Sequence, residues 1–386
     1  MSPTLQTIFI LGFSAYSLAH KLPAYIRYAA WCIMNCRTAT LGGHVEACPE
    51  GHFLRNHYNS CKHRVCPLCA YIQVQKWLFK QKARLLACNH YHLIFTMAHE
   101  LNDLWRYNPV FMTNIVFQCA RDTIFELLKD ERYLGALPGV IASLHTWSKT
   151  LLLHPHIHCL VTGGGLREGK WVPLKRDYLF PFAVARDLFR GKVLGALLRA
   201  YQNGKLVLPP KISPRDFRKL INKLWHKKWN VKVCEKYAHG KGVLTYLARY
   251  LRGGPIANSR IAKVENGQVT FNIGREKKEL MTLPISEFID RFIQHIPKPS
   301  AIYVRSYGLY ASGNKKDLAK CQEVVGVCGQ EEPLPNSWQD ILESYVAGTG
   351  NNQERPWECP ICGKRLVVKE TIPATRSRRK VKQLIT

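Results

Sequence analysis

Acidic residues are scarce in this chain: its 386 residues include 27 Asp and Glu against 56 Lys and Arg, a formal net charge of +29. A protein surface that binds no charged partner does not need such an excess of basic residues. Its simplest cause is a polyanionic partner, because each basic contact to a phosphate releases condensed counterions. The charge therefore favours nucleic acid as the partner. With 46% hydrophobic residues, a chain of this length has enough apolar material for two or three domains.

The sequence also lacks a long apolar run and a lipidation signal, which argues against a membrane helix or a lipid anchor. The segment Thr7–Phe13 is apolar but short. No basic residue precedes it and no convincing cleavage site follows it, so it is not typical of a signal peptide. We expect a cytoplasmic protein that binds nucleic acid and no membrane. The chain contains no internal repeat.

Cysteine, in contrast, is abundant, with fourteen copies. In a cytosolic chain cysteines are more often metal ligands or buried hydrophobic residues than disulfides. Cys66-Pro-Leu-Cys69 has the spacing of a zinc knuckle, Cys61 lies five residues before it, and Cys48 lies thirteen residues before Cys61. We predict that these four cysteines form a zinc site, for which four histidines compete as ligands: His44, His52, His57 and His63.

A second knuckle, Cys359-Pro-Ile-Cys362, lies near the C-terminus and is either a second zinc site or a small reduced turn. Its candidate partners are Cys321 and Cys328, which are separated by six residues. The chain around these residues is expected to contain a linker at Gly348–Pro356 and a mobile basic arm at Arg376–Lys382. The remaining cysteines are expected to be ordinary core or helix residues: Cys32, Cys36, Cys88, Cys119, Cys159 and Cys234.

Between the two cysteine regions, strand and helix patterns mix without regular alternation, and hairpin signals indicate antiparallel pairing. This combination predicts the α+β class. Apolar and aromatic runs predict strands at Tyr91–Met97, Gly139–Trp147 and His156–Thr162. Amphipathic periodicity predicts helices at Asn114–Lys129, Asp216–Trp229 and Gly242–Leu251.

The segment from Leu153 to Val161 contains two histidines that an extended strand would place on one face. Alternate side chains share a face, so His156 and His158 would project together, roughly 6.6 Å apart at the backbone. Two such imidazoles can converge on one divalent cation. His145 is the best placed third ligand, because the hairpin would return it near His156, whereas Pro155 is expected to end the regular strand. The alternative is that these are ordinary strand histidines.

Tyr246 and Tyr250 are four residues apart, so on the predicted helix they occupy one face, one turn apart. Arg249 and Arg252 accompany them, and the glycines after Arg252 end the helix. Taken alone, a tyrosine pair at this spacing is more often core packing than catalysis.

Together, the two motifs resemble the HUH endonucleases (histidine, hydrophobe, histidine) of the two-tyrosine class. More narrowly, the chain resembles the rolling-circle transposases of bacterial insertion sequences, the family numbered ninety-one. The resemblance runs from about residue 20 to 310. Six stretches carry it: Ala39–Cys48, Asn59–Cys69, Leu144–Trp147, His154–Gly165, Tyr246–Arg260 and Phe292–Gly308.

The resemblance implies an N-terminal zinc-binding domain, a nuclease domain with an HUH-type antiparallel sheet and flanking helices, and a C-terminal region. The expected bounds are 1–85, 86–312 and 313–386. It implies that His156 and His158 bind Mg²⁺ or Mn²⁺ and that Tyr246 and Tyr250 are the nucleophiles. Arg249, Arg252 and Arg260 are the expected DNA-binding residues.

The chain departs from the family at two positions. Gly51 stands where the family often has a second cysteine, which leaves His52 as a replacement zinc ligand. Lys149 stands where the family often has glutamine, so a third ligand for the catalytic metal is not carried over there.

The partners implied are single-stranded DNA at the ends of an insertion sequence, target DNA, and host replication or unwinding machinery, in a bacterial cytoplasm and nucleoid. Gly164–Lys170 has the glycine and lysine spacing of a phosphate-binding loop. However, Trp171 replaces the required Ser or Thr and no helix follows, so we expect no ATP.

Two other functions fit part of the sequence. A replication initiator or relaxase would use the same chemistry at a different origin. A non-enzymatic zinc-dependent DNA-binding regulator would explain the charge and the cysteines, but would give the histidine and tyrosine pairs no role.

Overall fold

The computed structural model describes residues 3–237, 254–274, 278–327, 355 and 357–375. The predicted helix at Gly242–Leu251, including Tyr246, Arg249, Tyr250 and Arg252, lies outside the described residues, as do Cys328 and the basic arm at Arg376–Lys382. The predicted linker at Gly348–Pro356 is described only at Arg355. In the described part of the chain, no helix is long and apolar enough to cross a membrane.

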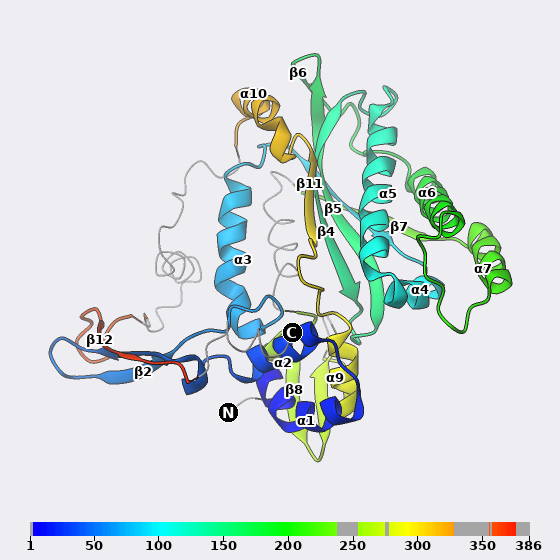
Figure 1. The fold of residues 1–386 in the computed structure, drawn as a ribbon. Helices are drawn as coiled ribbons and strands as arrows, with labels where there is room; N and C mark the ends of the chain where they lie inside the picture. The colour runs from blue at the N-terminus through cyan, green and yellow to red at the C-terminus, as the bar shows by residue number, and fades with distance from the viewer. Residues whose placement is uncertain (1–2, 238–253, 275–277, 328–354, 356, 376–386) are drawn as a thin grey trace.

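The centre of the molecule is a six-stranded antiparallel sheet (Figure 1). Five strands lie in the order β11-β4-β5-β3-β7, and β6 pairs with the far end of β5. The strand between β3 and β4, which is β5, therefore occupies the middle of the sheet. The bounds are β3 His90–Thr96, β4 Leu137–Trp147, β5 Leu153–Arg167, β6 Lys170–Pro173, β7 Asn230–Tyr237 and β11 Val304–Gly308.

Helices cover both faces of this sheet. On one face lie α4 (Asn102–Tyr107), α5 (Pro109–Lys129), α6 (Phe182–Gln202) and α7 (Pro214–His226), with α7 outermost (Figure 1). Alternate strand residues such as Phe95, Ile157 and Cys159 point into the core beneath them. On the other face, α3 (Pro67–Lys82) and α10 (Lys315–Val325) contribute Leu78 and Leu318 to a smaller core. Helices and an antiparallel sheet confirm the predicted α+β class.

The N-terminal helices α1 (Leu5–Ala19) and α2 (Ala24–Met34) share a core with a distant part of the chain. They pack with α9 (Ile285–Ile293) and with a separate sheet of β8 (Ile261–Glu265), β9 (Gln268–Asn272) and β10 (Leu280–Pro284). The contact is close at Gly12, where an added Cβ would lie 2.1 Å from Ile285. Residues 1–85 therefore do not form a separate core, since residues 256–296 complete it.

A three-stranded ribbon projects from the N-terminal region (Figure 1). Its middle strand is β1 (Gly43–Ala47), which pairs with β2 (Leu54–Tyr58) on one side and with β12 (Val367–Ile372) on the other. The strand order joins the C-terminal region to the N-terminal zinc region, across the expected boundary at 312/313. Four short 3-10 helices complete the described elements: Ala39–Leu41, His99–Leu101, Asn258–Arg260 and Ser312–Asn314.

The structure corrects one detail of the predicted strand. We expected Pro155 to end the regular strand, but β5 begins at Leu153 and continues through the proline. Between His145 and Trp147 of β4 the register shifts, so that β5 has an extra residue at this point. A bulge leaves a residue outside the ladder, and a proline without an N–H can occupy it. Its carbonyl still accepts a hydrogen bond from the Met97 amide at 3.0 Å.

Candidate catalytic and zinc sites

Three histidines lie together on the face of the central sheet opposite α5. His156 and His158 project from the middle strand, and His145 lies on β4 directly across from His156 in the register. One ring nitrogen from each of the three lies within 4.8 Å of the others. The hairpin thus brings His145 to the pair as the sequence predicts. Three imidazole nitrogens at this spacing could hold one divalent cation.

The hydrogen bonds of the two β5 histidines determine which ring nitrogen faces the cluster. The Nδ1–H of His156 donates to the backbone carbonyl of His154 at 2.7 Å, which leaves Nε2 as the unprotonated nitrogen. Nδ1 of His158 lies 2.8 Å from Nε2 of His92, a buried residue on β3. A hydrogen bond on the outer nitrogen fixes the orientation of a metal-binding imidazole. His92 is not among the ligands predicted from the sequence, although its alternation with Ile94 on a predicted strand was a usable signal.

Burial keeps these imidazoles uncharged. Desolvation lowers the pKa of His156 to about 4. The pKa of His145 is lowered well below its ordinary value by complete burial, and secondarily by the neighbouring His158 and His156. Burial likewise lowers the pKa of His92 to about 4. A metal binds neutral imidazole, so His145 and His156 are in the protonation state that binding requires at neutral pH.

A buried histidine from α9's C-terminal end supports the hairpin that carries the cluster. The Nε2–H of His295 donates to the carbonyl of Leu151 at 2.8 Å, and its Nδ1 accepts from the hydroxyl of Thr146 at 3.1 Å. Between His295 and the cluster lies Trp147, whose ring stacks on His145 with centroids 5.4 Å apart. These contacts connect the N-terminal core to the turn between β4 and β5.

The histidines open into a cavity of about 480 Å³. Its wall includes three cationic side chains from different elements, Lys149, Lys232 and Arg260. The guanidinium of Arg260 donates to the carbonyls of Asn272 at 2.8 Å and Lys149 at 2.7 Å, which holds it at the wall. The cavity therefore combines a potential metal site with positive charge, a combination suited to an anionic ligand. Eight further residues complete the lining: Ile94, Thr96, Trp147, Ser148, His154, Asn230, Ile273 and Gly274.

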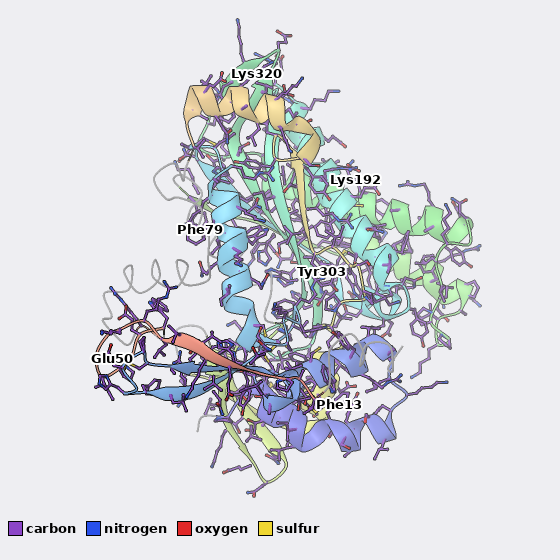
Figure 2. The ribbon with its side chains drawn as sticks, turned by 60° about the vertical axis from the view of Figure 1, so that its left-hand side comes forward. Phe13, Glu50, Phe79, Lys192, Tyr303 and Lys320 are labelled. Atoms are coloured by element: carbon purple, nitrogen blue, oxygen red, sulfur yellow. The ribbon has the colours of Figure 1, made fainter. Side chains whose placement is uncertain are left out.

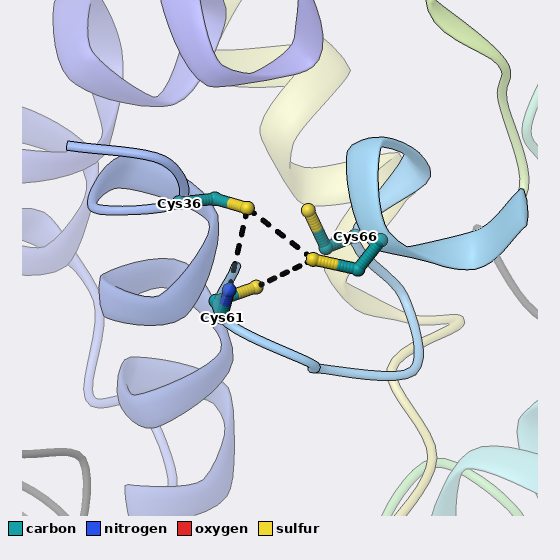
Figure 3. Close-up of side chains that lie close together, drawn as sticks. Cys36, Cys61 and Cys66 are labelled. Carbon is teal, nitrogen blue, oxygen red and sulfur yellow. Dashed lines mark hydrogen bonds between the residues drawn. The ribbon is translucent and has the colours of Figure 1, made fainter. Parts of the chain in front are cut away.

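Four cysteines cluster where the ribbon meets α2 and α3 (Figure 3). They are Cys36, Cys61, Cys66 and Cys69, and the Sγ of Cys69 lies 3.3 Å from that of Cys36 and 3.5 Å from that of Cys61. Hydrogen bonds from Cys36, then Cys61 and Cys66, lower the pKa of the Cys69 thiol. Four sulfurs at this spacing match a tetrahedral zinc site.

This cluster corrects the predicted ligand set. Cys36, which we expected to be an ordinary core residue, takes the place predicted for Cys48. The reason is the ribbon: β1 and β2 pair from Gly43 with Tyr58 to Ala47 with Leu54. Cys36 precedes this hairpin and Cys61 follows it, so the two cysteines meet at its base. Cys48 follows β1 directly and therefore lies at the tip.

At the tip, Cys48 meets the C-terminal knuckle. Cys48, His52, Cys359 and Cys362 form a second cluster that could hold a metal ion, with 3.5 Å between the sulfurs of Cys48 and Cys362. Cys359 and Cys362 thus lie in one candidate metal site, as in the predicted knuckle, but their partners are Cys48 and His52. Cys321, the partner we expected, is buried beside Leu318 in the core under α10.

The histidines that competed for the zinc positions have other surroundings. His44 and His57 are paired across β1 and β2, with stacked rings 5.0 Å apart. With Glu46 they form a third group of potential ligands. The Glu46 carboxylate already accepts two hydrogen bonds from Arg55 and one from His44. An ion pair therefore accounts for this group without a metal. Burial lowers the pKa of His63 to about 4, and its Nδ1 accepts from the Val65 amide.

The segment with phosphate-loop spacing is a hairpin. Gly164 to Arg167 of β5 pair with Lys170 to Pro173 of β6, and Glu168 and Gly169 turn the chain with positive φ angles of 49° and 76°. Trp171 lies in β6. The chain thus continues extended after the loop, as its sequence indicates.

Comparison with known proteins matches both halves of this architecture. Residues 8–97 match the family described as "Transposase zinc-binding domain", and residues 139–317 match the family described as "Putative transposase". The chain belongs to the rolling-circle insertion-sequence transposases of family ninety-one, with an N-terminal zinc-binding domain. It is thus an enzyme that acts on DNA as a nuclease and transferase, and it contains structural zinc.

Two curated relatives align over most of the chain. The putative transposase y4qJ of Sinorhizobium fredii (strain NBRC 101917 / NGR234) is 31% identical over 375 residues, covering 93% of each chain. The transposase for insertion sequence element IS801 of Pseudomonas savastanoi pv. phaseolicola is 28% identical over 360 residues, covering 87% of this chain and 79% of the relative. No solved structure matches.

Proposed function

We propose that this transposase nicks and rejoins single-stranded DNA at the ends of an insertion sequence through a 5′-phosphotyrosine intermediate. One observation carries the proposal: the cluster of His145, His156 and His158 opens into a cavity lined by cationic side chains. The nucleophiles we propose are Tyr246 and Tyr250. Family membership favours transposition over a replication initiator or relaxase, and over a regulator without enzymatic activity.

The donor set fits a divalent cation. His145, His156 and His158 would hold it through neutral imidazole nitrogens, and of the two expected ions Mn²⁺ tolerates nitrogen ligands better than Mg²⁺. When bound, such an ion polarises the scissile phosphate and stabilises charge on its oxygens. Lys149, Lys232 and Arg260 line the same cavity and would bind the flanking phosphates.

The chemistry conserves the energy of the phosphodiester. Tyrosine has a pKa near ~10 and attacks poorly at neutral pH without help. When the Tyr246 or Tyr250 hydroxyl attacks phosphorus, the Oη–P bond forms, the bond to the 3′-oxygen breaks, and a 3′-hydroxyl is released as the phenol loses its proton. The 3′-hydroxyl of another strand can reverse this step without ATP. Two tyrosines allow two such events, one for each end of the element.

The substrate class follows from the same proposal. We infer that the cavity takes a single strand, that target DNA follows in a second step, and that host replication or unwinding machinery supplies the separated strand.

A covalent adduct tests the proposed chemistry. Incubated with single-stranded DNA that carries the element's end, the protein should form an adduct that survives denaturation, with a free 3′-hydroxyl on the released fragment. The adduct peptide should map to Gly242–Arg252. Tyr246→Phe and Tyr250→Phe remove only a hydroxyl, and either single variant should still nick once. The double variant should form no adduct.

Two results would contradict the proposal. An adduct that persists in the double variant would place the nucleophile elsewhere, with Tyr237, Tyr303 and Tyr307 as the next candidates. Of these, Tyr303 is unsuited to attack, since burial raises its pKa to about 12. Cleavage without any adduct in the wild type would indicate a metal-activated water and an ordinary hydrolytic nuclease.

A further inference from the structure

The outer face of α7 presents a row of cationic side chains that the catalytic cavity does not use. Arg215, Arg218, Lys219 and Lys223 recur at helical spacing on the face opposite the buried Phe217, Ile221 and Leu224, and all four are exposed. We call these four residues the basic stripe. Because i, i+3, i+4 and i+8 share one side of a helix, the four charges lie on one continuous surface.

Within the part of the chain that the structure describes, three of the four cations of this stripe have no acidic partner. The helix has one acidic residue, Asp216, and its carboxylate accepts hydrogen bonds from the amide and hydroxyl of Ser213 at the N-cap. Among the described residues, Arg215, Arg218 and Lys219 form no ion pair. Lys223 lies 3.9 Å from Glu100, whose carboxylate is already bound by Lys227 at 2.7 Å. Positive charge concentrated on a folded surface and mostly without acidic partners indicates a polyanionic ligand.

The stripe continues toward the histidine cavity along the chain. After α7, the exposed Lys228 leads into β7, the edge strand of the central sheet. There Asn230 and Lys232 form part of the cavity wall. A DNA backbone that leaves the cavity around the β7 edge would meet Lys232 and then Lys228 before it reaches α7.

The form of the stripe favours duplex over single-stranded DNA. Binding of a single strand relies on aromatic side chains on which unstacked bases lie. The aromatic residue beside the stripe is Trp225, which is 40% exposed but packs one edge of its ring against α6, 3.6 Å from where a Cβ on Gly191 would lie. From Arg215 to Lys223 the stripe spans about 12 Å. This length is close to the ~12 Å width of the major groove of B-DNA, whose edges are rows of phosphates.

We propose that the basic stripe of α7 binds the sugar–phosphate backbone of the duplex that flanks the single strand in the histidine cavity. The contact would position the junction between duplex and single strand without reading its sequence, because charged contacts to phosphate carry no base information. The inference rests on the proposed function for the position of the single strand. The contact itself requires only that the ligand is duplex DNA.

A binding experiment tests the stripe separately from catalysis. The probes are an oligothymidylate strand alone and the same strand extended from a stem-loop hairpin, both titrated in EDTA so that no cleavage occurs. The test variant is Arg215→Gln/Arg218→Gln/Lys219→Gln. A matched control, Lys315→Gln/Lys316→Gln/Lys320→Gln, removes three exposed charges from α10, which lies on the other face of the sheet (Figure 2).

We expect the α7 variant to lose affinity for the hairpin probe and to bind the single strand as the wild type does. Each lost phosphate contact lowers the slope of log K against log salt by ~0.9, so three contacts lower it by about 2.7. Over a fourfold increase in salt concentration, the ratio of wild-type affinity to variant affinity for the hairpin probe should therefore change by about 40-fold. The α10 control should retain the wild-type slope on both probes.

Two outcomes would overturn the inference. Equal slopes for the α7 variant and the α10 control on the hairpin probe would mean that the stripe has no part in duplex binding. An equal loss on both probes would assign the stripe to the single strand. Neither outcome affects the proposed chemistry, which is read from the covalent adduct.

Discussion

His92 and His158 face each other across β3 and β5, with Nε2 of the first 2.8 Å from Nδ1 of the second and their rings stacked at 5.1 Å. His158 can present Nε2 to the metal cluster only if its Nδ1 carries the proton, and His92 must then accept that hydrogen bond. His92 is therefore a positioning residue for the proposed metal site. Burial keeps it uncharged, which leaves its nitrogen able to accept.

Replacing His92 should weaken the metal site without removing a ligand. His92→Phe keeps an aromatic ring on the strand but loses the acceptor, so we expect a ~10–100-fold rise in the Mn²⁺ concentration needed for half-maximal cleavage. High Mn²⁺ should restore much of the rate. His92→Gln, whose amide oxygen can accept from Nδ1, should lie closer to wild type. An unchanged Mn²⁺ requirement in His92→Phe would show that the hydrogen bond does not matter.

Removing a ligand should separate cleavage from binding. His156→Ala should lower cleavage by at least ~10²–10³-fold, the loss seen when one group that stabilises transition-state charge is removed. DNA affinity should change little, since it depends mainly on contacts between cations and phosphates. The matched control is His154→Ala, which lies in the same cavity wall and keeps the carbonyl that accepts from His156.

The two variants are compared after EDTA treatment and addition of Mg²⁺ or Mn²⁺. Wild-type cleavage by His156→Ala would remove His156 from the metal site. Equal loss in His154→Ala would indicate general damage to β5.

The cluster at the base of the ribbon should hold zinc that supports the N-terminal fold. Cys36→Ala should lose one of the two zinc ions that the two cysteine clusters could hold, as measured by metal analysis of the purified chain. Because binding of structural zinc contributes its free energy to folding, the α1–α2 region should also become sensitive to protease. Cys119→Ala, a buried cysteine of α5 outside both clusters, should keep all its zinc. Full zinc content in Cys36→Ala would restore Cys48 as the candidate fourth ligand.

Local patterns predicted three of the six strands of the central sheet, β3, β4 and β5, and the histidines that they carry. These strands and the helix at Asn114–Lys129 followed from periodicity, and the pairing of Cys66 with Cys69 in one metal site from a short turn. His145 could be predicted because a hairpin brings nearby residues together by register. These features depend on interactions within a few tens of residues, which the sequence pattern records directly.

The partition of the cysteines could not be predicted in the same way. Which of Cys36 and Cys48 joins Cys61 depends on where the β1–β2 hairpin closes, since the Asn59 amide donates to the Gly42 carbonyl at 2.8 Å and returns the chain to its starting point. The pairing of Cys48 with Cys362 depends on β12 adding to β1, a contact across more than three hundred residues. Spacing along the chain does not indicate either contact.

The second cluster should act as a clasp that holds the C-terminal region on the ribbon. Cys48 and His52 come from the β1–β2 turn, and Cys359 and Cys362 from the knuckle that precedes β12. Around it, Lys364 reaches Glu50 at 2.6 Å, but both side chains are largely exposed and such a pair contributes little. Loss of the metal would free β12 and leave a two-stranded hairpin, which is marginally stable in water.

We therefore expect Cys362→Ala to lose one zinc and to be cut faster by trypsin at Lys364 and Arg365, which follow the knuckle, and at Lys369 in β12. The matched control is Ile361→Ala, an exposed neighbour outside the cluster that should retain both zinc content and protection. Cys48→Ala should reproduce the Cys362→Ala pattern, although the two residues are 314 positions apart, because each supplies a ligand to the same ion. Tryptic release of the C-terminal region in Cys362→Ala but not in Cys48→Ala would show that the knuckle stabilises itself and that no clasp joins the two ends of the chain.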